Sequence, residues 1–80
     1  MTTAGITATV ERLARKVRAD LPPLEAGQRL VEDLGLDSIE MLSLAVEIED
    51  AFEIHLDDVD EGAITTVGEL LAAIEERARR

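Results

Sequence analysis

The sequence is organised around ten residues near its middle, Val31-Glu32-Asp33-Leu34-Gly35-Leu36-Asp37-Ser38-Ile39-Glu40. Asp37 and Glu40 have the spacing of a capping box, in which each side chain accepts a hydrogen bond from the backbone N–H of the other residue. Such a box sets the first residue of a helix. We therefore predict a helix that begins at Ser38 and continues to about Glu53.

The segment before this helix predicts a first helix and a long loop. Apolar residues recur at helical spacing from Thr7 to about Ala19, and Pro22-Pro23 prevents the helix from continuing much beyond Leu21. A loop from about residue 20 to 36 follows, and its apolar side chains indicate that it packs on the core. Residues 1–6 are expected to be a flexible N-terminus.

The C-terminal part predicts one more helix, and the whole chain an all-α fold. Thr66 and Glu69 form a second capping box ahead of an apolar stripe, and a short helical turn is expected over Asp58–Ala63. With Phe52 as the one aromatic residue, the core consists of Leu, Ile, Val and Ala, which suits helices better than a β-sandwich. The predicted fold is a small three- to four-helix bundle, a single domain over residues 1–80.

Length and composition exclude several classes of function. A chain of 80 residues has no deep interior in which to build a catalytic cavity. There is no Cys, and His55 is the one His, so thiolate and His-pair metal sites are excluded, and nothing is spaced to orient His55 beside Ser38 as in a hydrolase. No apolar run approaches the ~20 residues that span a bilayer. We expect a noncatalytic, monomeric, cytoplasmic protein without a metal site or a membrane contact.

The net charge is concentrated in one segment. The chain has 18 acidic and 8 basic residues, a formal charge of −10, and residues 37–61 contain ten acidic residues and no Lys or Arg. This field repels the phosphates of nucleic acids and attracts basic protein surfaces. A solvated acidic face that only aids solubility is the alternative.

A helical projection of residues 38–53 separates two apolar faces. The core-facing arc contains six residues: Met41, Leu44, Ala45, Ile48, Ala51 and Phe52. A second stripe of Ile39, Leu42 and Val46 lies beside acidic residues, which is typical of a transient protein-binding site, although burial on two sides of the bundle is an alternative, most of all for Leu42.

The segment 31–40 resembles the attachment motif of acyl carrier proteins. In that family the motif reads Leu-Gly-x-Asp-Ser-Leu, and its Ser carries 4′-phosphopantetheine through a phosphodiester, transferred from coenzyme A by a dedicated transferase. Ser38 has that position here. The resemblance continues through the acidic helix and Phe52 into Ile64-Thr65-Thr66-Val67, and it implies a bundle of acyl-carrier type.

The resemblance also implies a function and its partners. The protein would be a noncatalytic phosphoprotein that holds acyl groups as thioesters and delivers them to acyltransferases, synthases or ligases with basic docking patches. The implied partner surface consists of Asp37, Ile39, Glu40, Leu42, Val46, Glu49 and Asp50. The acyl group is expected inside the bundle, among Leu44, Ile48, Phe52, Leu56, Ile64 and Leu70.

Two departures from the family pattern bear on the pathway. Ser43 stands where many fatty-acid carriers have an acidic residue, and the loop between Leu21 and Ser38 is shorter than in a housekeeping fatty-acid carrier. Both favour a specialised pathway such as polyketide assembly, with a housekeeping fatty-acid carrier as the alternative. A peptidyl or aminoacyl carrier is disfavoured by the acidic helix. From a different class, an acidic helical adaptor without a cofactor is the competing hypothesis.

Overall fold

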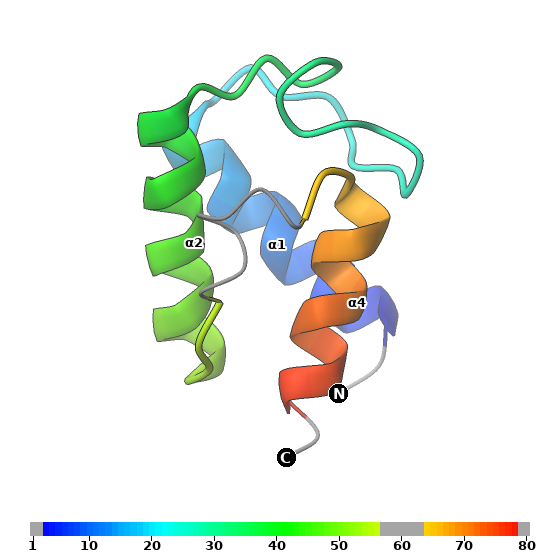
Figure 1. Cartoon of the computed structure of the whole chain (residues 1–80), viewed down its shortest axis with the longest axis vertical. Coiled ribbons are helices and arrows are strands. Elements are labelled where there is room, and N and C mark those ends of the chain that lie inside the picture. The colour runs from blue at the N-terminus through cyan, green and yellow to red at the C-terminus, as the bar shows by residue number, and fades with distance from the viewer. Residues whose placement is uncertain (1–2, 57–63, 79–80) are drawn as a thin grey trace.

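The structure is a computed structural model that describes residues 3–56 and 64–78. Within these residues the chain forms three helices and no strand: α1 (Thr3–Val17), α2 (Ser38–Phe52) and α4 (Val67–Ala78). Figure 1 shows α1 between α2 and α4, while the loop after α1 crosses one end of the bundle. The predicted all-α bundle is confirmed, and the turn expected over Asp58–Ala63 lies outside the described residues.

The bounds of α1 correct the sequence prediction at both ends. The helix begins at Thr3, so residues 3–6 are helical and do not belong to a flexible N-terminus. Ile6 is buried one turn before Val10, and the two side chains continue the same apolar stripe. The helix ends at Val17, earlier than the expected Ala19, because the chain turns there towards the buried Leu21.

The core is aliphatic and receives side chains from all three helices and from the loops. No polar or charged residue is buried in the described part of the chain. The long loop packs on the core as predicted, through four leucines. The buried residues are Ile6, Val10, Leu13, Ala14, Leu21, Leu30, Leu34, Leu36, Leu44, Ala45, Ile48, Leu56, Ile64, Val67, Leu70 and Ile74.

Backbone hydrogen bonds tie the long loop to the start of α4. The Leu30 N–H donates to the Thr65 carbonyl over 2.9 Å, and the Val67 N–H donates to the Gln28 carbonyl over 2.9 Å. The second capping box is confirmed, since the Glu69 N–H donates to Thr66 Oγ1 and Glu69 Oε1 accepts from the Thr66 N–H. The loop and α4 therefore hold each other in register.

Gly35 provides the last bend before α2. Its φ of +73° is a left-handed conformation that residues with a Cβ adopt only at a cost. Its carbonyl accepts a hydrogen bond from Arg18 Nη1, so the chain just after α1 holds the loop just before α2. A Cβ on Gly35 would lie 3.2 Å from Arg18 Nη1, which leaves little room for a side chain.

We predict that Gly35→Ala lowers the free energy of unfolding by about 1–2 kcal/mol, since alanine would be strained at this φ and would crowd Arg18. Urea denaturation followed by circular dichroism measures the change. Gly27→Ala is the matched control: a Cβ on Gly27 would meet no other atom within 4 Å, and its φ is not positive, so stability should change by less than about 0.5 kcal/mol. Equal losses in the two variants would contradict the role of Gly35.

Candidate functional site

Ser38 is the first residue of α2 and is exposed. The preceding Asp37 is the N-cap: its Oδ1 accepts the Glu40 N–H over 2.7 Å, and Glu40 Oε1 accepts the Asp37 N–H over 3.1 Å. The predicted capping box is thus confirmed. It holds the backbone of Ser38 in one conformation, while the hydroxyl stays accessible to another molecule.

The end of α2 that carries Ser38 is suited to an anionic group. The first N–H groups of a helix have no partner within the helix, and the helix dipole is positive at this end. A phosphate attached to Ser38 would lie in this field. The carboxylates of Asp37 and Glu40 offset part of it, but each is fixed by a backbone N–H of the cap. The site therefore fits a phosphodiester at Ser38.

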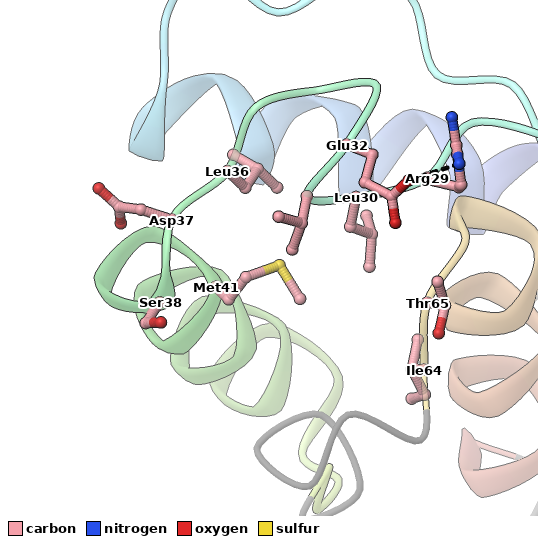
Figure 2. A pocket seen from close by; sticks show the side chains of 10 residues that line it. Arg29, Leu30, Glu32, Leu36, Asp37, Ser38, Met41, Ile64 and Thr65 are labelled. Atoms are coloured by element: carbon pink, nitrogen blue, oxygen red, sulfur yellow. Dashed lines mark hydrogen bonds and ion pairs between the residues drawn. The ribbon is translucent and has the colours of Figure 1, made fainter.

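A cavity of about 490 Å³ adjoins Ser38 (Figure 2). Ser38 and Asp37 lie at one end of it and Arg29 and Thr65 at the other, with Met41 between them. The lining combines an apolar floor with a polar rim: Arg29, Leu30, Val31, Glu32, Leu36, Asp37, Ser38, Met41, Ile64 and Thr65.

The ion pairs of Arg29 hold the wall of this cavity opposite Ser38. Arg29 Nε lies 3.2 Å from Asp33 Oδ2, which also accepts the Arg29 N–H over 2.7 Å, and Arg29 Nη1 donates to Glu32 Oε2. The hydrogen bond from the Arg29 side chain, with that from its backbone, lowers the pKa of the Asp33 carboxyl. The pKa of Glu69 is likewise lowered, by the backbone N–H groups of Thr66 and Thr65. Both carboxylates are therefore held in their charged forms.

Most of the residues expected to contact the acyl chain do not line the cavity beside Ser38. Of the six, Ile64 lines the cavity beside Ser38. The other five are packed in or against the core: Leu44, Ile48, Phe52, Leu56 and Leu70. Sequence reasoning missed Leu30, Leu36 and Met41 as cavity residues, although the position of Leu36, directly before the cap, places it close to Ser38 along the chain.

The second apolar stripe of α2 is exposed. Ile39, Leu42 and Val46 are 76%, 51% and 55% exposed, so the alternative that the bundle buries Leu42 is wrong. Ala51, expected on the core side, is also exposed, because Phe52 makes the contact with the core in this last turn. The stripe begins directly after Ser38 and follows the helix away from it.

The acidic residues of α2 differ in their surroundings. Glu40 Oε1 lies 3.5 Å from Arg18 Nη1, and Glu47 Oε1 lies 2.6 Å from Lys16 Nζ. Glu49 accepts the Leu56 N–H over 2.7 Å, while Asp50 is exposed. Sequence reasoning did not place the two cations from the end of α1 on this surface. The sequence does contain a signal for these ion pairs: basic residues occur near the end of α1, and the second helix is acidic.

Residues 3–56 and 64–78 contain no candidate metal centre, since no group of three or more of their His, Cys, Asp and Glu side chains could hold a metal ion. The acidic run from Asp57 to Glu61 lies outside the described part of the chain. None of the helices described is long and apolar enough to cross a membrane.

Comparisons with known proteins agree with this geometry. The family model for the phosphopantetheine attachment site matches residues 7–74. An acyl carrier protein of an Exiguobacterium species is 35% identical over 65 residues, covering 81% of this chain and 82% of the relative. The acyl carrier protein of Thermotoga maritima is 31% identical over 65 residues, with coverages of 81% and 80%. A solved structure reported as an acyl carrier protein from Mycobacterium tuberculosis superposes with a TM-score of 0.71 at 35% identity, covering 92% of this chain and 95% of that one.

Proposed function

The chain belongs to the acyl carrier protein family, noncatalytic carriers of phosphopantetheine, and on this premise we propose that Ser38 bears the 4′-phosphopantetheine arm. The observation that carries the proposal is the position of Ser38, exposed and in the first turn of a capped helix. The motif around it, Leu34-Gly35-Leu36-Asp37-Ser38-Ile39, follows the family pattern Leu-Gly-x-Asp-Ser-Leu, with Ile39 in place of the last leucine.

The residues around Ser38 have positioning roles in this reaction. The Ser38 hydroxyl oxygen would form the new bond to the phosphorus that bears the pantetheine arm of coenzyme A, while the P–O bond of the pyrophosphate bridge breaks and 3′,5′-adenosine bisphosphate leaves. The hydroxyl proton passes to the transferase, so Ser38 needs no activating base of its own chain. Asp37 is fixed as the N-cap and keeps the hydroxyl on a rigid turn. The N–H groups of the first turn favour the phosphodiester once it has formed. The thiol at the end of the arm then holds the acyl group as a thioester.

We also propose that α2 is the face that partner enzymes recognise. The exposed stripe of Ile39, Leu42 and Val46 supplies apolar contact, and the surrounding carboxylates attract basic patches. The proposed partners are the phosphopantetheinyl transferase and enzymes that load, extend or release acyl groups. The acidic members of this surface are Asp37, Glu40, Glu49 and Asp50.

The pathway is proposed to be specialised, such as polyketide assembly. Two features support this: Ser43 replaces the acidic residue of many fatty-acid carriers, and the loop between Leu21 and Ser38 is short. We expect the intact mass of the protein isolated from its own cells to include acyl chains that keep oxygen at the β-carbon. Saturated chains alone would instead indicate housekeeping fatty-acid synthesis.

The acyl chain is proposed to enter the bundle past Ile64. This residue lines the cavity beside Ser38 and also belongs to the core cluster that contains Leu44, Ile48 and Leu70. It therefore connects the point of attachment with the aliphatic interior. An apolar chain could replace aliphatic contacts there without leaving a polar group unpaired, because the described core buries no polar side chain.

Intact-mass measurement tests the attachment. After incubation to completion with coenzyme A and a broad-specificity phosphopantetheinyl transferase, the wild type should gain one phosphopantetheine and Ser38→Ala none. Ser43→Ala, which removes the other serine of α2, is the matched control and should still gain it. A folded, initially unmodified wild type that gains no mass would favour the cofactor-free adaptor, and addition to Ser38→Ala would place the arm elsewhere.

Amide chemical shifts test where the acyl chain lies. Loading the arm with an octanoyl group should shift the amides of Leu44, Ile48, Leu56 and Leu70 relative to the unacylated holo-protein, because the chain contacts the core. Unchanged shifts at these residues would mean that the chain stays in solvent. Changes confined to Leu30, Leu36 and Met41 would place it in the cavity beside Ser38 instead.

A further inference from the structure

Arg18, the residue that follows α1, reaches three oxygen atoms with one side chain. Its Nη1 donates to the Gly35 carbonyl and lies 3.5 Å from Glu40 Oε1, and its Nε donates to Asp20 Oδ1 over 3.3 Å. The residue is partly buried. One cation therefore connects the end of α1 with the last bend of the long loop and with the first turn of α2.

The contact with Glu40 leads directly to the site of attachment. Glu40 Oε1, the atom beside Arg18, also accepts the N–H of Asp37, the residue before Ser38. Without Arg18, this carboxylate would lose its cation and the Gly35 carbonyl its side-chain donor. Gly35 precedes Ser38 and Glu40 follows it, so Arg18 restrains the backbone on both sides of the serine.

Arg18 also supplies charge where attachment adds the opposite charge. The Ser38 hydroxyl is neutral, whereas a phosphodiester there carries one negative charge close to the carboxylates of Asp37 and Glu40. Among the described residues, Arg18 is the one cation within ion-pair distance of either carboxylate. The Glu40 side chain is 24% exposed, so water and salt screen this pair only in part. The guanidinium therefore offsets repulsion that the new phosphate would meet.

Two other cations of α1 have no such contact within the described part of the chain. Lys16 pairs with Glu47, more than two helical turns beyond Ser38. Arg12 is exposed and forms no ion pair with a described residue. Replacing Arg12 therefore removes the same charge from α1 without touching the cap.

We infer that Arg18 is a positioning residue for the attachment of phosphopantetheine: it holds the bend at Gly35 and the carboxylate of Glu40, and its charge offsets that of the phosphodiester formed at Ser38. This rests on the proposed attachment at Ser38. Arg18 acts through these residues and takes no part in the bond-making step. Its role concerns how the hydroxyl is presented, and not how an enzyme docks on the exposed face of α2.

Steady-state kinetics test the positioning role. The apo-forms of Arg18→Gln and Arg12→Gln are titrated against a phosphopantetheinyl transferase at saturating coenzyme A. We expect Arg18→Gln to lower kcat about tenfold with KM unchanged, because the hydroxyl is held less firmly while the docking face is retained. Arg12→Gln should keep both constants. A rise in KM alone would mean that Arg18 contacts the enzyme, and equal constants in the two folded variants would mean that it has no role; either result overturns the inference.

Thermal unfolding of the apo- and holo-forms tests the charge of Arg18 separately. A residue that only stabilises the fold lowers the Tm of both forms equally. If Arg18 offsets the phosphodiester, attachment should lower the Tm of Arg18→Gln by about 3 °C more than it lowers that of Arg12→Gln. Equal changes on attachment in the two variants would overturn the charge role.

Arg18→Lys separates geometry from charge. Lysine keeps the positive charge but lacks the planar set of donors with which arginine reaches several acceptors. The change in Tm on attachment should then match that of the wild type, while kcat lies between those of the wild type and Arg18→Gln. Should Arg18→Gln fail to fold, a wild-type kcat in Arg18→Lys would overturn the positioning role.

The outcomes separate this inference from the proposed attachment. A wild type that is modified normally, together with variants that behave alike, would overturn the role of Arg18 and leave attachment at Ser38 intact. A folded, initially unmodified wild type that gains no phosphopantetheine would overturn the attachment itself.

Discussion

The reciprocal hydrogen bonds between Asp37 and Glu40 set the point at which α2 begins, and the site depends on that point. A shift of the sequence by one residue through this cap would turn every side chain of α2 by about 100° and would move the stripe Ile39–Val46 relative to α1. Arg18, which precedes the long loop, also contacts the residues around the cap. Arg18 donates to the Gly35 carbonyl and lies close to Glu40, so the residue that follows α1 holds both the bend before the cap and one of its two carboxylates.

The distribution of charge follows from the same contact between α1 and α2. An acidic helix is destabilised by repulsion among its own carboxylates. Lys16, in the last turn of α1, and Arg18, directly after α1, relieve this repulsion on one side of α2 only. On one side of the apolar stripe, Glu40 and Glu47 lie beside these cations. On the other side, no cation of the described residues lies within ion-pair distance of Glu49, Asp50 or Glu53, so the negative charge of α2 is concentrated there.

The parts of the fold that the sequence predicts correctly depend on interactions within one turn. The capping boxes Asp37–Glu40 and Thr66–Glu69 connect residues three positions apart, so their spacing is enough to identify them. The start of α1 escapes prediction because no capping pattern precedes Thr3, and the helical state of these residues depends on the burial of Ile6 by distant parts of the chain. The cavity beside Ser38 escapes prediction for a similar reason: it exists because Leu30 pairs with Thr65, 35 positions later along the chain.

The proposed function requires a rigid point of attachment at Ser38 and an interior that can make room for an acyl chain, and different kinds of interaction hold these two regions of the structure. The backbone near Ser38 is held by directional hydrogen bonds, in the cap and between the loop and α4, and such bonds tolerate little displacement. The interior is held by aliphatic contacts, which have no preferred direction and which an acyl chain of the same chemistry can replace. Ile64 lies where the two regions meet, one residue before the Thr65 carbonyl that accepts from Leu30. If the acyl chain enters past Ile64 as proposed, movement of that side chain would admit it while the hydrogen bond next to Ile64 keeps the loop, and with it the start of α2, in place.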